Sequence, residues 1–381
     1  MLVNTVANNQ TSYTNEDYLR ANQARELQIK IGQPSLRDYI RIVSENYLPD
    51  CPVTKADILA AENMFGPDVG SLKGKTTRCN PHAVRQVVEP LEPHVMHHNR
   101  NVMICADVMF VHIIPFFVMI SRHIKFGTIQ SMADRKQGTL MGAIKAVLQV
   151  YRWAGFVVML ALMDGEFDGL QGKMVEYEVV LNTTAQNKHV GEVEQYIRTI
   201  KERMRAIYST LPYRNIPPWL VIEMAKSAVF WLNAFPQQNG IGGGQSPRAI
   251  IVGTGIDFTK HCKYQFGEYV HTPEERDNTM AMRTFGALAL RPTRNAQGRF
   301  YFFSLSTGRV ITQGQATSLP MPDDVIDQVH QIAHQQKSNL GMIFENRNNI
   351  QLAPVSTVRY YCVQCVVVIA PLMGGKSSGR G

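Results

Sequence analysis

The sequence lacks several features that would place a chain in a familiar class. Its six cysteines are scattered at positions 51, 79, 105, 262, 362 and 365, with a single Cys-x-x-Cys pair at Cys362–Cys365. No apolar run approaches the roughly 18 residues that a membrane span requires. The start of the chain, MLVNTVANNQTSYTNED, turns polar at once and has no apolar stretch typical of a secretory signal. We therefore expect a soluble protein in a reducing, intracellular compartment.

Several catalytic signatures are absent as well. The chain has no Tyr-x-Asp-Asp motif of a reverse transcriptase, no Asp-Thr/Ser-Gly motif of an aspartic protease and no Walker A run. The segment GTGID at 253–257 has the wrong order for the protease motif, and GIGGGQ precedes no helix of a βαβ unit, so we interpret it as a linker.

The composition is that of a globular protein with a mild preference for polyanions. Hydrophobic residues make up 45% and charged residues 18% of the chain, and 39 Lys+Arg against 31 Asp+Glu give a net charge of +8. A length of 381 residues allows two or three domains. The positive balance favours nucleic acid as a partner without establishing it.

Two strongly apolar stretches each contain one acid. Residues 156–163 are eight apolar residues in a row, which predicts a strand buried on both faces, and they run directly into Asp164. The second stretch, VMICADVMFV at 102–111, holds Asp107. Either Asp alone is explained as a turn former or helix cap, but two such strands suggest a shared divalent metal, for which carboxylates are suitable ligands. Glu166 and Asp168 follow Asp164, and we expect them to be solvated loop acids.

A helix predicted over 190–211 offers a third acid. Its apolar residues recur at steps of 4, 3, 4, 3 and 4, starting from Val193, which indicates a buried face. Glu194 lies at the edge of that face, and Arg198, Lys201 and Arg205 share its flank. These residues either form helix-stabilising ion pairs or combine a metal-binding acid with cations for a phosphate backbone. Glu192, on the other flank, is the rival to Glu194.

The expected elements form a mixed α/β order from residue 95 onward. Three strands (102–111, 113–122 and 126–133), a helix (137–151), the strand before Asp164, a strand at 178–184 and further helices at 190–211 and 217–235 follow one another. We expect a helical and linker segment at 1–93, an α/β core at 94–252, a small β-rich module at 253–322, and a helix with a flexible tail at 323–381. The first 20 or so residues are expected to be disordered. A basic loop at 70–85, with Lys73, Lys75, Arg78 and Arg85, is either a phosphate contact or a solvated linker.

These segments resemble the integrase region of copia-type (Pseudoviridae) LTR retrotransposon polyproteins. The likeness spans roughly residues 30–335 and is carried by DVMFVHIIPFFVMISR, ALMDGEFDGL, HVGEVEQYIRTIKERMRAI, AKSAVFWLNAFP with SPRAIIVG, and the β-rich segment from FGEYV to GRV. The resemblance implies an α/β, RNase H-like mixed sheet flanked by helices, with a helical N-terminal segment and a small β-rich C-terminal module. It also implies a catalytic and metal-binding triad of Asp107, Asp164 and Glu194.

The chain departs from that family in three places. The spacing of 30 residues from Asp164 to Glu194 is shorter than the roughly 35 usual in retroviral-type cores, and His189-Val190-Gly191 stands where the copia pattern has Asn-Gly. The zinc module of two His and a Cys-x-x-Cys is not intact, because only Cys51 and Cys79 lie upstream of the core.

The resemblance implies an enzyme that transfers DNA strands with Mg²⁺ or Mn²⁺, through 3′-end processing followed by integration. Arg198, Lys201 and Arg205 would contact DNA, both element ends and target, and the protein would assemble as a homo-oligomer on DNA in the nucleus and cytoplasm. Two alternatives stay open. One is a catalytically silent DNA-binding remnant, and the other is an RNase H-type nuclease that cuts without joining.

Overall fold

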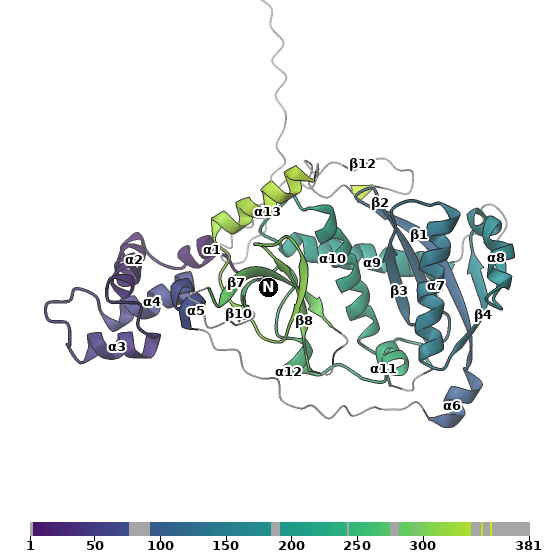
Figure 1. Ribbon diagram of the computed structural model, residues 1–381, viewed down its shortest axis with the longest axis horizontal. Coiled ribbons are helices and arrows are strands. Elements are labelled where there is room, and N and C mark those ends of the chain that lie inside the picture. Colours follow the sequence, from purple (N-terminus) through teal and green to yellow (C-terminus); the bar gives the residue numbers. More distant parts are fainter. Residues whose placement is uncertain are drawn as a thin grey trace, which may run out of the picture. The chain divides into compact units, whose positions relative to one another are not determined.

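The structure is a computed structural model (Figure 1). It describes residues 3–75, 92–183, 191–241, 244–274, 282–293, 295, 297–336, 344–345 and 351–352. The chain divides into two compact units, residues 1–342 and 343–381. In the second unit the described residues are two short antiparallel strands, β11 (Phe344–Glu345) and β12 (Gln351–Leu352); the expected flexible tail lies outside the described residues. None of the described helices is long and apolar enough to cross a membrane.

The N-terminal segment contains two helices within residues 6–30, so the prediction of about 20 disordered residues is wrong. Thr5 forms a parallel bridge with Met321, and the Val6 N–H donates to the Met321 carbonyl at 3.0 Å. This pairing spans more than 300 positions, which no local pattern could reveal. Five helices occupy the segment: α1 (Val6–Gln10), α2 (Asn15–Lys30), α3 (Leu36–Ser44), α4 (Lys55–Phe65) and α5 (Val69–Lys75).

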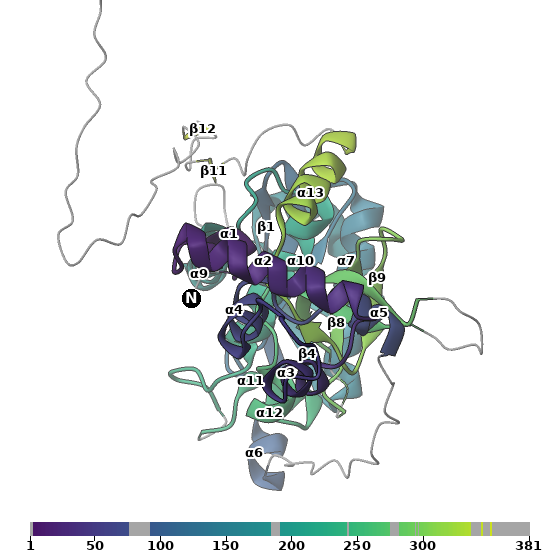
Figure 2. The same ribbon diagram turned by 90° about the vertical axis from the view of Figure 1, so that its left-hand side faces the viewer.

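Local chemistry accounts for where these helices begin. Thr14 and Asp17 form a capping box at the start of α2, and Thr54 and Asp57 form another at the start of α4. Helix α5 replaces the first part of the basic loop predicted at 70–85; residues 76–91, with Arg78 and Arg85, lie outside the described residues. Figure 2 views α2 and α4, which pack against each other.

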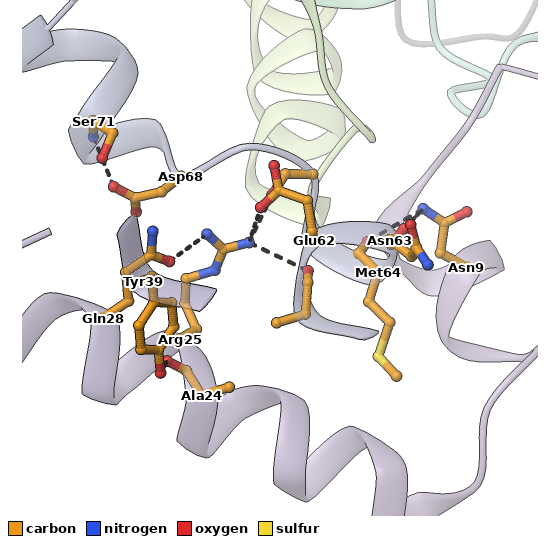
Figure 3. A network of polar contacts seen from close by, with 12 residues as sticks. Asn9, Ala24, Arg25, Gln28, Tyr39, Glu62, Asn63, Met64, Asp68 and Ser71 are labelled. Atoms are coloured by element: carbon orange, nitrogen blue, oxygen red, sulfur yellow. Dashed lines mark hydrogen bonds and ion pairs between the residues drawn. The ribbon is translucent and has the colours of Figure 1, made fainter. Parts of the chain in front are cut away.

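One partly buried arginine joins α2 to α4 (Figure 3). The Arg25 guanidinium donates to the Gly66 carbonyl at 2.6 Å and to the Ala61 carbonyl at 3.2 Å, and it lies 3.6 Å from Glu62. Gly66 directly follows α4, so the helix supplies no N–H to its carbonyl, whereas Ala61 lies inside the helix. Arg25 therefore supplies a donor to an acceptor at the end of α4.

The core of the first unit is a mixed five-stranded sheet in the order β3-β2-β1-β4-β5. Strands β1, β2 and β3 are antiparallel neighbours, and β1, β4 and β5 are parallel. The hairpin, the third strand and the fourth strand match the sequence prediction. The strands are β1 (Asn101–Val111), β2 (Ile114–Ser121), β3 (Gly127–Ser131), β4 (Val157–Met163) and β5 (Val180–Thr183).

Helices cover both faces of this sheet, which explains why β1 is apolar on both sides. Ile104 and Ala106 of β1 share a buried cluster with Ile144 and Leu148 of α7, which Figure 1 shows lying along the sheet. The alternate residue Cys105 faces α9 on the opposite side. The helices of this region are α6 (Pro93–His98), α7 (Gln137–Trp153), the 3₁₀ helix η1 (Gly165–Leu170), α8 (Gln171–Val175), α9 (Gly191–Thr210), α10 (Pro218–Asn233), α11 (Pro247–Val252) and α12 (Phe258–His261).

A second, antiparallel sheet follows in the order β10-β6-β7-β8-β9, so the small β-rich part is an open meander of consecutive strands with β10 added at one edge. Its buried cluster includes Val270, Ala287, Phe300 and Phe302. The elements are β6 (Tyr269–Pro273), β7 (Thr284–Pro292), β8 (Phe300–Ser304), β9 (Val310–Gln313), β10 (Thr317–Ser318) and the helix α13 (Asp323–Gln335). The predicted fold class is confirmed in its mixed sheet with flanking helices, its N-terminal helices and its C-terminal antiparallel sheet.

Replacing Arg25 by Met tests the junction between α2 and α4. We expect the free energy of unfolding to fall by about 1–3 kcal/mol, because the Gly66 carbonyl loses its donor in a partly buried place. Urea denaturation followed by circular dichroism measures the change. The matched control is Arg20→Met, which removes an exposed pair with Glu16 and is expected to change stability by less than about 0.5 kcal/mol. Equal effects of the two substitutions would contradict the assigned role of Arg25.

Candidate active site

The register of β1 and β4 places two of the predicted site residues side by side. Ala106 pairs with Met163 in the parallel ladder, and each is followed directly by an aspartate. Asp107 and Asp164 therefore each lie one residue beyond this pair, on two adjacent segments of the same chain. Neighbouring strands in a sheet are about 4.8 Å apart. Both are partly buried. The two apolar stretches of the sequence meet at their acids.

The charges of three other acids act on Asp107 at this position. Burial raises the pKa of the Asp107 carboxyl, the charges of Asp164, Glu166 and Glu194 act in the same direction, and together they bring it to about 6. The Val108 N–H, which donates to Asp107 Oδ1 at 2.6 Å, opposes the shift. The direction follows from physics, since burial and like charges both disfavour the ionised form. The elements that bring these acids together are β1, the end of β4, η1 and α9.

Asp164 stands at a helix boundary, as the alternative interpretation from sequence proposed. It is the N-cap residue of η1, with an extended backbone, and its carbonyl accepts the Phe167 N–H at 3.0 Å. Its side chain, however, makes no capping hydrogen bond to that helix. Capping therefore does not explain why a carboxylate stands at this position.

The structure separates Glu194 from its rival Glu192. Glu192 accepts from the Arg122 Nε at 3.1 Å and from the Cys105 thiol at 3.3 Å. Although burial opposes it, these hydrogen bonds and the charge of Arg122 hold the pKa of Glu192 below its usual range. A carboxylate engaged in this way has a structural explanation. Glu194, one position past the buried Val193, is instead among the charges that act on Asp107.

Glu166 is the residue that reasoning from the sequence missed. It is exposed, as predicted, but its charge acts on Asp107 and it lies 3.4 Å from Arg135. Arg135 in turn lies 5.3 Å over the ring of Phe110 in β1. The sequence offered one sign of this, because Glu166 follows Asp164 by only two residues. It did not show that these residues form the 3₁₀ helix η1, from which the charge of Glu166 acts on Asp107. Asp168 is exposed and is not among the charges that act on Asp107.

The carboxylates around Asp107 are of the type that binds a hard divalent cation such as Mg²⁺. Burial and the negative charge of the neighbouring acids raise the pKa of Asp107. Among the described residues, no three His, Cys, Asp or Glu side chains lie together in a way that could hold a metal ion. The described cysteines Cys51, Cys105 and Cys262 are free thiols.

The three predicted DNA-binding cations lie on α9, the helix that carries Glu194. Arg198 and Arg205 are exposed, whereas Lys201 is partly buried. The buried side of the helix consists of Val193, Tyr196, Ile200 and Met204, so the predicted stripe is correct except that Tyr196 belongs to it and Ile197 and Ile207 are only partly buried. The catalytic, metal-binding and DNA-binding roles of all six residues stay predictions.

Comparison with known proteins gives a likeness to retroviral integrase cores. No protein-family model matches the chain, and no curated protein does. Among solved structures, the catalytic core domain of HTLV-2 integrase in complex with magnesium is similar in its trimeric form (18% identity, TM-score 0.30, 39% of this chain and 95% of that chain) and its dimeric form (18%, 0.29, 39% and 94%). The catalytic core domain of BIV integrase is similar at 16% identity and a TM-score of 0.29, over 39% of this chain and 93% of that chain. Each likeness covers well under half of this chain.

The raised pKa of Asp107 predicts a stability change that depends on pH. The folded-state value of about 6 lies above the usual 3.8, so the ionised carboxylate destabilises the fold fully above pH 6, and this cost fades as pH falls toward 3.8. Without divalent metal, we expect Asp107→Asn to raise the free energy of unfolding by about 1–3 kcal/mol at pH 7.5 and to have little effect at pH 3.8. Urea titrations in EDTA at the two pH values measure the difference.

The matched control is Asp168→Asn, an exposed acid of η1, which is expected to leave the free energy of unfolding within about 0.5 kcal/mol of the parent. A destabilising effect of Asp107→Asn at pH 7.5, or the same effect at both pH values, would contradict the proposed electrostatic crowding.

Proposed function

We propose that the protein is a divalent-metal-dependent polynucleotidyl transferase of the integrase type. The observation that carries the proposal is the β1–β4 register, which sets Asp107 and Asp164 on adjacent strands, with the charges of Asp164, Glu166 and Glu194 acting on Asp107. A carboxyl group with a perturbed pKa that is set beside other acids is a candidate for a functional site. The resemblance of the surrounding segments to copia-type integrases supports the finer assignment to a retrotransposon enzyme.

Asp107 and Asp164 would hold Mg²⁺ or Mn²⁺, with Glu194 completing the ligand set. When bound, such ions activate a hydroxyl nucleophile and stabilise the leaving oxygen of a phosphodiester. The chain itself supplies orientation: the β1–β4 register fixes the two aspartates, and the buried face of α9 fixes Glu194. Glu166, held by Arg135, adds negative charge that favours a cation at this point.

The proposed reaction has two stages at the same acids. Water first trims the end of the element's DNA, and the freed 3′ hydroxyl then attacks a phosphodiester of the target. The exposed side of α9, with Arg198 and Arg205, would contact the sugar–phosphate backbone. Assembly as a homo-oligomer on DNA and residence in the nucleus and cytoplasm belong to the same proposal.

A strand-transfer assay with Mn²⁺ and a labelled donor end tests this function. We expect joined product from the wild-type chain and a loss on the order of 1,000-fold in Asp164→Asn, since a metal ligand contributes several kcal/mol to the reaction. Asp168→Asn, the exposed acid of η1, is the control that keeps activity. Cleavage without joining would favour an RNase H-type nuclease. DNA binding with neither product, unaffected by Asp164→Asn, would favour a catalytically silent DNA-binding protein.

The salt dependence of DNA binding tests the role of α9. Arg198→Ala/Arg205→Ala is expected to weaken binding to duplexes of any sequence and to reduce the slope of log K against log salt by about 2, because each arginine neutralises roughly one phosphate. Fluorescence anisotropy at several salt concentrations gives the slope. Arg37→Ala/Arg309→Ala removes two exposed arginines on other elements and is the control expected to leave the slope unchanged. A slope that responds equally to both double variants would remove α9 from the DNA interface.

A further inference from the structure

The hairpin of β1 and β2 extends beyond the end of β4. The parallel pairing of β1 with β4 ends at Ala106, whereas β1 continues to Val111 with β2 as its partner. Val111 pairs with Ile114, so a loop of only two residues closes the hairpin. Because a chain advances by at most about 3.5 Å per residue, this loop lies within about 20 Å of Asp107.

Both residues of this loop have a left-handed backbone. The φ angle is 50° at His112 and 61° at Ile113. Two-residue hairpin loops of type I′ need a positive φ at both positions and therefore favour Asn and Gly. His tolerates a positive φ, but for a β-branched residue such as Ile it is a genuine outlier. Strained residues of this kind are concentrated at functional sites, so the loop is a candidate for one.

The loop also places an apolar side chain in solvent. Ile113 is 78% exposed, whereas its neighbour His112 is buried. Within the hairpin, Phe110 of β1 is the other large apolar side chain that is exposed, at 38%. Stable protein interfaces cover roughly 800 Å² on each partner, far more than two side chains supply. The hairpin therefore ends in a narrow apolar protrusion and not in a face that could dock a folded protein.

An arginine lies between this protrusion and the acids. The Arg135 guanidinium lies 5.3 Å over the Phe110 ring, and its Nη1 lies 3.4 Å from the Glu166 carboxylate. Glu166 is one of the acids whose charge acts on Asp107. The Arg135 side chain is 56% exposed, and a guanidinium stacked on a ring can still donate N–H groups to a phosphate. The protrusion thus has a cation beside it that suits a nucleic-acid backbone.

The bases of DNA can accept such a protrusion. Proteins that bend DNA insert apolar side chains, Ile among them, between neighbouring base pairs and partly unstack them. Insertion requires a side chain that projects from a firm support, and the paired strands β1 and β2 give Ile113 that support. Base pairs of a duplex are about 3.4 Å apart, so the span of about 20 Å from Asp107 to the loop corresponds to about six base pairs. DNA bound at the acids is therefore within reach of the loop.

We propose that Ile113 is a wedge that inserts between two neighbouring base pairs of DNA bound at Asp107 and Asp164. The inference rests on the proposed function, which supplies the DNA and its place. Phe110 packs against the displaced base, and Arg135 contacts the adjoining phosphate. Ile113 touches no reacting atom and is a positioning residue. The unstacked step holds the duplex in one register, no more than about six base pairs from the phosphodiester at the acids.

Duplexes with 2-aminopurine at successive positions test the wedge, because this base fluoresces more strongly when it is unstacked. We expect the full chain in Mg²⁺ to raise the fluorescence about threefold at one or two adjacent positions, since insertion unstacks a single step. Ile113→Asn is expected to remove the rise. Ile29→Asn, which changes an exposed isoleucine of α2, is the matched control that keeps it.

The melting temperature of Ile113→Asn separates a positioning role from a structural one. Asn adopts a positive φ more readily than Ile does, so we expect the melting temperature to be unchanged or higher. A variant that folds at least as well as the wild type and no longer unstacks DNA would support the wedge. A lower melting temperature would make Ile113 a packing residue of the hairpin and contradict the proposal.

A mismatch in the DNA gives a second test through affinity. A mismatch at the unstacked step lowers the cost of insertion, so we expect the wild type to bind the mismatched duplex about tenfold more tightly than the matched one. Ile113→Asn is expected to bind both duplexes equally. Fluorescence anisotropy measures the affinities. Equal affinities of the wild type for the two duplexes would contradict insertion.

The outcomes for the wedge and for the proposed strand transfer can be told apart. Joined product without a fluorescence rise at any position would overturn the wedge and leave the strand transfer in place. A rise that depends on Ile113, without joined product, would uphold the wedge and overturn the strand transfer. Self-association that is lost in Ile113→Asn, with no change in 2-aminopurine fluorescence, would assign the loop to a contact between copies of this chain and overturn the wedge.

Discussion

The parallel pairing of β1 with β4 is the constraint on which the acid group depends. Hydrophobic packing fixes that pairing from both sides, because alternate residues of β1 face α7 and α9. A slip of one residue would turn Asp107 from one face to the other and carry Ala106 out of the cluster that it shares with α7. The position of the acid is therefore set by the apolar residues around it. This explains how a carboxylate can be held in a place that burial and like charges make unfavourable.

The two glutamates at the start of α9 lie within one helical turn but have different electrostatic surroundings. Glu192 is compensated by Arg122 and the Cys105 thiol, and its pKa is lowered despite burial. Glu194, two residues later, adds its charge to the Asp107 region. Two acids of one helix turn thus have different surroundings: one is paired with Arg122, and the charge of the other contributes to the raised pKa of Asp107.

The sequence predicted the parts of the structure that depend on local pattern. The apolar runs predicted strands β1 and β4, and the spacing of apolar residues predicted helix α9. It failed where distant residues decide. The first 20 residues are polar but pair with Met321, and Glu166 reaches Asp107 only through the tight turn of η1. The pairing of Glu192 with Arg122, 70 positions away along the chain, could not be seen in the local pattern either.

The acids around Asp107 would also couple the binding of a metal ion to the binding of a nucleic acid nearby. Around Asp107, four carboxyl groups repel a phosphate backbone as well as one another, so DNA approaching the metal-free site meets an opposing potential. A divalent cation would reverse that potential, and the gain in DNA affinity must equal the gain in metal affinity that DNA provides, since coupling between two ligands is reciprocal. The cations on the exposed side of α9 lie on the helix that carries Glu194 and would hold the backbone close enough for this coupling to operate. Under the proposed function, acids that are unfavourable alone would become favourable when both ligands are bound.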